Sequence, residues 1–143
     1  MGFEKSITSS VVQCWKDAGA EVGWVDRWGY FSESKSEDDD LPAFFFGSSN
    51  WNPEKLVGLP DPEIPFGLIL QDEATDSDLK KIAALKSLTS LTLGLTRITD
   101  SGVKELLSLS KLRTVHLSGC AVGDESLNYL ARLVFLEFLT FSF

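Results

Sequence analysis

The sequence predicts an α/β fold in which short strand–turn–helix units stack side by side into a solenoid. The first observation is an apolar strand pattern that returns every 24 residues in the second half of the chain. It reads Leu88-x-x-Leu91-x-Leu93, then Leu112-x-x-Val115-x-Leu117, then Leu136-x-x-Leu139-x-Phe141. The second observation is an apolar pattern at helical spacing after the first two strands, with Val103, Leu106 and Leu109, then Leu127, Leu130 and Leu133. A regular period of this kind is typical of a repeat architecture.

Each unit needs its neighbours, because one strand and one helix cannot bury their own apolar faces. Alternation along the strand directs Leu91 and Leu93 inward, so the residues between and beside them face outward. The helices then cover the inward face of the sheet. We therefore expect a curved structure with a parallel sheet on the concave side and helices on the convex side.

The same period extends towards the N-terminus and predicts a repeat at residues 64–87. A shift of 24 residues from Leu88 leads to Ile64 and places Gly67 and Ile69 at the inward strand positions. Leu68 and Leu70 are the alternative inward pair, since a slip of one residue exchanges the two faces of a strand. The sequence leaves this register open.

Residues 41–63 are interpreted as a degenerate first repeat. Its strand positions are apolar: Leu41, Phe44 and Phe46. Trp51 takes the place that Ile98 has in the later repeat, and a helix of one or two turns is expected over residues 52–57. Pro53 suits the start of that helix, where its missing N–H costs little. The aromatic character of this repeat is typical of an end unit.

The first 40 residues are predicted to form an N-terminal cap, so the domain boundaries fall at 1–40 and 41–143. Apolar residues at helical spacing predict an amphipathic helix over residues 5–18. The aromatic, glycine-punctuated segment 21–31 predicts a β-hairpin that turns near Asp26–Gly29, and the acidic run that follows predicts a polar loop. The solenoid is divided into repeats 41–63, 64–87, 88–111 and 112–135 and a final strand, 136–143.

Two polar ladders follow the same period. Three aspartates lie just before the helical patterns: Asp76, Asp100 and Asp124. An aspartate at an N-cap accepts hydrogen bonds from the free amides of the first helical turn, so a structural role is favoured over a catalytic one. The second ladder follows the strands at Ser49, Asp72, Thr96 and Cys120. Its side chains are expected to bond to turn backbone, which makes Cys120 a structural thiol rather than a nucleophile.

The run Thr99-Asp100-Ser101-Gly102-Val103-Lys104-Glu105-Leu106, preceded by Leu-x-x-Leu-x-Leu, resembles the cysteine-containing type of leucine-rich repeat. The resemblance covers residues 64–143 clearly and 41–63 weakly, and it implies a leucine-rich repeat solenoid. It also implies protein–protein recognition by a curved sheet, usually without catalysis. The chain departs from the long family members in having no F-box-like segment, so a role in ubiquitin ligation is not carried over. Residues Val12–Trp24 resemble the leader of some short bacterial repeat proteins, which implies no activity.

Composition limits the classes of partner. The net charge is −8 and the sequence contains no basic patch, so nucleic acid and anionic membranes are disfavoured, because both attract clustered positive charge. No apolar run approaches the length of about 18 residues that a transmembrane helix needs, and no secretory signal is visible. Cys14 and Cys120 form no disulfide framework, which favours the cytoplasm. We expect no metal and no cofactor.

The concave face is the first candidate binding site. Alternation predicts three columns of outward residues: Ser90–Thr114–Phe138, Thr92–His116–Thr140 and Gly94–Ser118–Ser142. The candidate contacts among them are Thr92, Thr114, His116, Phe138 and Thr140. His116 is the only histidine, and it has three interpretations: an exposed histidine without a role, a ligand contact or a general base. Catalysis would need a carboxylate within reach, brought in from loop 33–40.

Two further surfaces are candidates. Trp24, Trp28 and Tyr30 either anchor an interface or cover the open end of the solenoid core, and the second reading is favoured. At the other end, Leu136 and Phe143 belong to a last strand that no helix follows. An exposed strand edge is a template for pairing, so we expect self-association there or a partner that completes the solenoid.

The function that the sequence supports best is a non-catalytic protein-interaction module with a protein partner. One alternative is a self-associating scaffold or a structural fragment of a larger repeat array. The least favoured alternative is an enzyme that uses His116.

Overall fold

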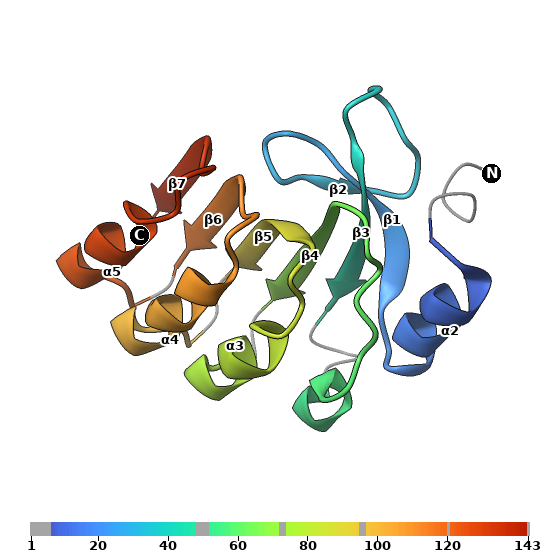
Figure 1. Ribbon diagram of the computed structural model, residues 1–143, viewed down its shortest axis with the longest axis horizontal. Coiled ribbons are helices and arrows are strands. Elements are labelled where there is room, and N and C mark those ends of the chain that lie inside the picture. Colours follow the sequence, from blue (N-terminus) through green and yellow to red (C-terminus); the bar gives the residue numbers. More distant parts are fainter. Residues whose placement is uncertain (1–6, 48–51, 72–73, 95–96, 120, 143) are drawn as a thin grey trace.

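The computed structural model describes residues 7–47, 52–71, 74–94, 97–119 and 121–142. Within these residues the centre of the protein is one seven-stranded sheet with the strand order β2–β1–β3–β4–β5–β6–β7. The helices lie along one side of this curved sheet (Figure 1). The predicted α/β solenoid, with strands on the concave side and helices on the convex side, is confirmed.

Parallel strands supply the repeated part of the sheet. They are β3 (Leu41–Phe46), β4 (Phe66–Gln71), β5 (Leu88–Gly94), β6 (Thr114–Ser118) and β7 (Phe138–Ser142). The segments between them contain η2 (Pro53–Leu56), α3 (Asp76–Ile82), α4 (Asp100–Lys104) with its continuation η3 (Glu105–Ser108), and α5 (Asp124–Leu130). Consecutive strands are hydrogen-bonded neighbours, so each unit lies against the next one in sequence.

One apolar core lies between the sheet and the helices. Leu91 and Leu93 of β5 are fully buried, as are Val103 and Leu106 on the helical side of the same repeat. Complete burial of one such side chain stabilises the fold by about 1.5–3 kcal/mol. The stacking of repeats therefore supplies the burial that a single strand–helix unit lacks.

Strand β4 settles the register that the sequence leaves open. Leu68 and Leu70 are fully buried in the core, in register with the core leucines of β5. Ile69 lies on the concave side, in a small apolar cluster with residues of β1 and β3. The pairing with β5 shifts between Phe66 and Gly67. A fixed period of 24 residues does not include this shift, so it assigns the inward positions of β4 one residue away from where they lie.

The strand and the short helix predicted for the degenerate first repeat are both present. Phe44 and Phe46 of β3 are buried in the core. Helix η2 begins at Pro53, and the side chain of Asn52 caps it by accepting a hydrogen bond from the backbone N of Glu54 at 3.1 Å. The predicted role of Trp51 falls outside the described residues.

The N-terminal segment covers the first end of the core. Its elements are α2 (Ser9–Asp17), β1 (Glu21–Val25) and β2 (Phe31–Ser32). Trp15 of α2 is fully buried, and its ring stacks on that of Phe44 with centroids 4.3 Å apart. Its Nε1 donates to the carbonyl of Pro60 at 2.9 Å. Because β1 pairs antiparallel with both β2 and β3, the predicted hairpin also extends the sheet of the repeats, which confirms the N-terminal cap.

The predicted N-cap positions are wrong by one residue. Helices α3 and α4 begin at Asp76 and Asp100, and the N-cap residues are Thr75 and Thr99. The Asp76 carboxylate instead accepts from the backbone N of Thr99 at 2.8 Å and from its Oγ1 at 2.5 Å. The aspartate therefore binds the N-cap residue of the helix in the following repeat rather than capping its own helix.

The next repeat shows the same arrangement, in which an aspartate accepts hydrogen bonds from a backbone amide and a hydroxyl of the following repeat. Asp100 accepts from the backbone N of Gly123 at 2.8 Å and from the hydroxyl of Ser126 at 2.5 Å. The hydrogen bond from the Ser126 hydroxyl, followed by the one from Gly123, lowers the pKa of Asp100 below its ordinary value. These bonds tie neighbouring repeats together on the convex side. The second predicted ladder, Ser49, Asp72, Thr96 and Cys120, lies outside the described residues.

Candidate binding groove on the concave side

The strand register places the candidate residues of the concave face in the expected columns. Thr92, His116 and Thr140 are register partners across β5, β6 and β7. Thr114 and Phe138 are register partners in the neighbouring column. Thr140 is exposed, His116 is half-buried and Thr114 is buried. Another segment of the chain therefore covers part of the concave face.

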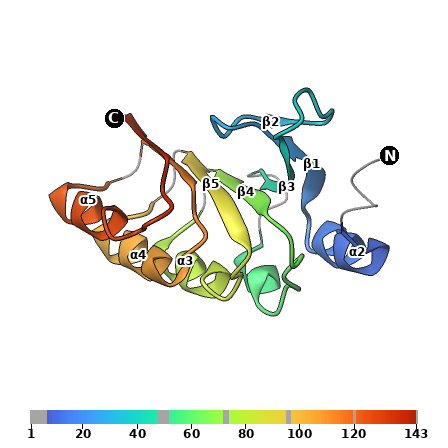
Figure 2. The same ribbon diagram turned by 45° about the horizontal axis from the view of Figure 1, so that its top comes forward.

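The cover is the hairpin turn, residues 26–30, which connects β1 and β2. The side chain of Asp26 holds the turn together by accepting from the backbone N of Trp28 at 2.9 Å and from that of Tyr30 at 3.0 Å. The hairpin lies on the side of the sheet away from the helices (Figure 2). An aspartate that accepts from amides two and four residues further on is a common way to close a turn.

Two threonines attach the hairpin turn to the sheet. Thr92 Oγ1 donates to the carbonyl of Gly29 at 3.2 Å, and Thr114 Oγ1 donates to the carbonyl of Arg27 at 3.5 Å. Gly29 has a φ of +89°, and a Cβ built on it would overlap the His116 ring. Both the backbone conformation and the close approach therefore require glycine. Thr92 and Thr114, predicted as ligand contacts, already bind the chain's own turn.

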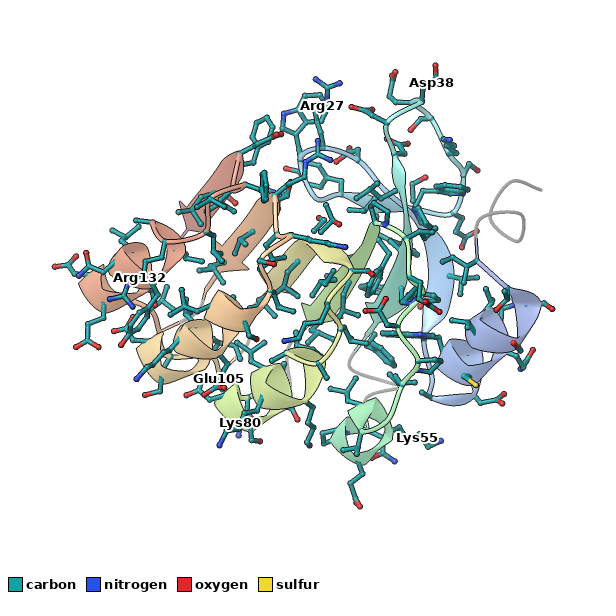
Figure 3. The ribbon with its side chains drawn as sticks, viewed as in Figure 1. Arg27, Asp38, Lys55, Lys80, Glu105 and Arg132 are labelled. Atoms are coloured by element: carbon teal, nitrogen blue, oxygen red, sulfur yellow. The ribbon has the colours of Figure 1, made fainter. Side chains whose placement is uncertain are left out.

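An exposed ion pair connects the hairpin turn to the acidic loop that follows β2. Arg27 Nη2 lies 2.6 Å from Asp39 Oδ2. Arg27 and Asp38 project from the molecule on the same side, away from Lys80 and Glu105 (Figure 3). An exposed pair of this kind contributes at most about 1 kcal/mol, so the ion pair orients the turn more than it stabilises the fold.

A concave groove of about 720 Å³ remains between the hairpin turn and the sheet. Its apolar part contains Phe31, Phe45 and Ile69, and its polar part contains Gln71, Thr92, Gly94, His116, Ser118 and Thr140. Trp28 and Tyr30 stand at its edge with 50% and 73% of their surface exposed. Among the described residues that line the groove, none carries a permanent charge. The size and the apolar lining with a few polar groups are typical of a ligand site.

His116 is held as a neutral side chain in this groove. Its Nδ1 is hydrogen-bonded to Thr140 Oγ1, and its Nε2 is buried without a hydrogen-bond partner. Burial lowers the pKa of His116, and the nearby negative charge of Asp26 raises it by a smaller amount. In the described part of the chain no carboxylate is hydrogen-bonded to either ring nitrogen. A general base needs such a partner, and these residues do not supply one to His116.

The three aromatics of the leader, Trp24, Trp28 and Tyr30, differ in burial. Trp24 is half-buried against the main core, and the Lys35 ammonium lies 5.1 Å from the centroid of its ring. The favoured reading, that these aromatics cover the end of the core, therefore holds for Trp24. It is wrong for Trp28 and Tyr30, which are exposed at the edge of the groove. Trp15 of α2 is the aromatic side chain that is fully buried against the end of the core.

The sequence reading also missed the apolar part of the groove. Phe45 of β3 and Ile69 of β4 are the outward neighbours of buried core residues in their strands. Alternation would have placed Phe45 outward from Phe44 and Phe46. Ile69 required the correct register of β4, which the fixed period did not supply.

The last repeat exposes apolar residues other than those expected. Leu136 is half-buried against the core, whereas Val134 and Phe135 are 83% and 61% exposed. Phe143 lies outside the described residues. Strand β7 forms one edge of the described sheet.

The described residues show neither a metal site nor a membrane-spanning helix. They contain no group of three or more histidine, cysteine, aspartate or glutamate side chains placed to hold a metal ion. No helix in this part of the chain combines the length and the apolar character that crossing a membrane requires.

The fold is a solenoid of parallel strands with a groove on its concave side. Residues 84–107 and 108–131 each match the family model described as "Leucine Rich repeat". These two segments are therefore similar to leucine-rich repeats, as the sequence resemblance predicts. Among solved structures, the chain is similar to an internalin C2 (inlC2) from Listeria monocytogenes str. 4b F2365, at 29% sequence identity with a TM-score of 0.46. That match covers 63% of this chain and 36% of the internalin chain. No curated protein matches the sequence.

Proposed function

We propose that the protein is a non-catalytic protein-interaction module and that its partner binds in the concave groove. The observation that carries this proposal is the groove itself, which combines an apolar floor with exposed Trp28 and Tyr30 at its edge. Tryptophan and tyrosine dominate the binding energy of many interfaces, because they bury a large area at a small cost in conformational entropy. The general role of leucine-rich repeats in protein recognition, which the family match implies, supports the same function.

Site-specific photo-crosslinking tests the position of the partner. A photo-reactive phenylalanine analogue at position 30 lies at the groove edge, and the same analogue at position 135 lies in the last repeat, where Phe135 is also exposed. We expect a crosslinked partner from position 30 and none from position 135. Crosslinking from position 135 alone would show that the partner binds elsewhere.

A groove-filling variant tests the same proposal independently. Gly94 lines the groove, and a Cβ built on it meets only Gln71 Cγ at 3.9 Å, so Gly94→Trp places a large side chain in the groove without a backbone collision. We expect this variant to lose crosslinking at position 30 while keeping its circular dichroism spectrum. Undiminished crosslinking would contradict binding in the groove.

Self-association through the last repeat is a second candidate function. The observation that favours it is the exposure of Val134 and Phe135 beside the edge strand β7, since apolar side chains next to an unpaired edge promote association. Sedimentation velocity of the wild type and of Phe135→Glu tests it. The candidate requires a concentration-dependent dimer that the substitution abolishes, and a wild-type monomer at all concentrations would exclude it.

A further inference from the structure

A second recess shares one lining residue, Trp28, with the concave groove. This acidic pocket has a volume of about 260 Å³ and is lined by Asp26, Arg27, Trp28, Glu37, Asp39 and Asp40. Trp28 lines both the acidic pocket and the concave groove. Trp28 is therefore the side chain that the two recesses have in common.

The two recesses differ sharply in charge. The described lining of the concave groove has no permanent charge, whereas the acidic pocket has four carboxylates and one guanidinium. Arg27 neutralises only part of this charge through its ion pair with Asp39 at 2.6 Å. The pocket therefore attracts a cation, and the groove rejects any charged group, which would lose its hydration there without gaining a partner.

Asp40, which lines the acidic pocket, has a carboxylate oxygen that no donor among the described residues satisfies. Its side chain is buried, with the residue only 6% exposed. Oδ2 accepts from the backbone N of Ser36 at 2.9 Å and from that of Glu37 at 3.0 Å. Oδ1 has no hydrogen-bond partner. A buried acceptor without a partner costs free energy, so a ligand donor that reaches Oδ1 would remove that cost.

The chain's own Arg27 illustrates the chemistry that this surface accommodates. Its guanidinium carbon lies 5.4 Å from the centroid of the Trp28 ring, while its Nη2 reaches Asp39. An aromatic face beside a carboxylate is a favourable environment for a cation. Glu37 and Asp40 offer further carboxylates in the same pocket.

From these observations we propose that the ligand is a protein segment in which an apolar side chain is accompanied by a lysine or arginine. The apolar side chain enters the concave groove, and the basic side chain enters the acidic pocket on the other side of Trp28. This inference rests on the proposed function and adds the chemistry of the partner. The net charge of −8 assists it, since a chain of this charge attracts basic segments over long range.

Selection from a phage-displayed library of short random peptides against the immobilised full chain tests the inference. The dissociation constant of an enriched peptide is then measured by fluorescence polarisation for wild type, Gly94→Trp, Glu37→Lys and Asp38→Lys. Glu37 and Asp38 are neighbours in the same exposed loop, but only Glu37 lines the acidic pocket. Both lysine substitutions change the net charge equally, so their comparison separates a local contact from the overall charge.

We expect the enriched peptides to combine a basic residue with a large apolar one. Glu37→Lys should weaken their binding by about tenfold or more, as loss of a true interface contact does, while Asp38→Lys changes it much less. Enriched peptides that lack basic residues but lose binding to Gly94→Trp would overturn this inference. That outcome would leave the proposed function standing. Binding that ignores both Gly94→Trp and Glu37→Lys, or a selection that enriches no peptide family, would count against the inference and the groove together.

Discussion

Gly29 lies directly against the imidazole of His116. The hairpin turn reaches the sheet at this point, and a Cβ on Gly29 would overlap Cδ2 and Nε2 of the ring. The carbonyl of the same glycine accepts the hydrogen bond from Thr92 Oγ1. The N-terminal cap thus forms one wall of the concave groove as well as covering the end of the core.

The first prediction concerns substitution of this glycine. Gly29→Ala should detach the hairpin turn from the sheet, because the methyl group collides with His116, and the collision is relieved if the turn lifts. We expect a loss of global stability of about 1–2 kcal/mol, mostly from the positive φ. Faster amide hydrogen exchange at residues 26–31 measures the detachment.

Gly58→Ala is the matched control for that experiment. Gly58 also has a positive φ, +78°, but a Cβ built there has no neighbour within 4 Å. Gly58→Ala should therefore lose a similar amount of global stability but leave amide hydrogen exchange in the hairpin turn unchanged. Equal exchange rates in the two variants would contradict the role of the Gly29 contact.

Much of the solenoid follows from the sequence, because its apolar positions repeat. Leu91 and Leu93 identify the inward face, and the alternation between them places Thr92 and His116 in one concave column, as the register of β5 and β6 confirms. The period fails where local geometry changes. The shifted pairing between Phe66 and Gly67 moves β4 by one residue, and only backbone geometry reveals that shift.

The site was only half predictable, because it joins segments that no periodicity relates. The concave columns and the aromatic leader could each be identified. The leader reaches the concave columns where Gly29 contacts His116. Neither segment contains a sequence pattern that predicts this contact. The reassignment of Asp76 has a similar cause. Its spacing places it at a helix start, and only the structure shows that its partner is Thr99 of the next repeat.

The second prediction concerns pH. Burial lowers the pKa of His116, so the unfolded state takes up a proton before the folded state does. Stability should therefore be complete above about pH 6.5, the ordinary pKa of histidine. It should decrease as the pH falls through the lowered pKa of the folded protein, by at most about 1.4 kcal/mol per pH unit.

Urea unfolding across this range, with an NMR titration of the single imidazole, measures the effect. His116→Gln should remove the pH dependence near neutrality and leave the acid unfolding of the carboxylates unchanged. A pKa for His116 at or above the ordinary value in the folded protein would contradict the prediction.

The third prediction concerns the aspartates that begin the helices. Asp76→Ala should destabilise the fold by about 1–3 kcal/mol, because it leaves the Thr99 amide and hydroxyl without their acceptor. Asp124 also begins a helix but is exposed. Asp124→Ala should cost only the interaction with its own helix dipole, about 0.3–1 kcal/mol. Chemical denaturation of both variants measures the difference, and equal losses would disprove coupling between repeats through Asp76.

The fourth prediction exchanges residues between equivalent positions. Gly123 is the N-cap of α5, with an extended backbone like that of Thr99. A Cβ built on it meets Asp100 Oδ2 at an ordinary 3.6 Å. Gly123→Thr should therefore stabilise the protein by about 0.5–1.5 kcal/mol, through a more restricted unfolded chain and a new hydrogen bond. Asp100→Ala should remove the hydrogen-bond part of that gain when the two changes are combined.

Gly102 is the counterpart that does not tolerate a side chain. A Cβ on Gly102 would overlap the carboxylate of Asp76, so Gly102→Ala displaces the group that binds the N-cap residue of the next helix. We expect a loss of about 1–3 kcal/mol, close to that of Asp76→Ala, because both changes break the same hydrogen bonds. A double-mutant cycle should then show strong non-additivity, and additive losses would refute the shared cause.

The fifth prediction concerns the aromatic cover of the core. Trp15→Ala should cost about 3–5 kcal/mol, because it removes a fully buried ring. Trp15→Phe should cost less, since a ring can still stack on Phe44 while the hydrogen bond to the Pro60 carbonyl is lost. Trp28→Ala, by contrast, should change stability by no more than about 0.5 kcal/mol, because Trp28 is half exposed at the groove edge. Urea denaturation measures all three. If Trp28→Ala unfolds the protein as readily as Trp15→Ala, then Trp28 is a structural residue, and its exposure at the groove no longer supports an interface.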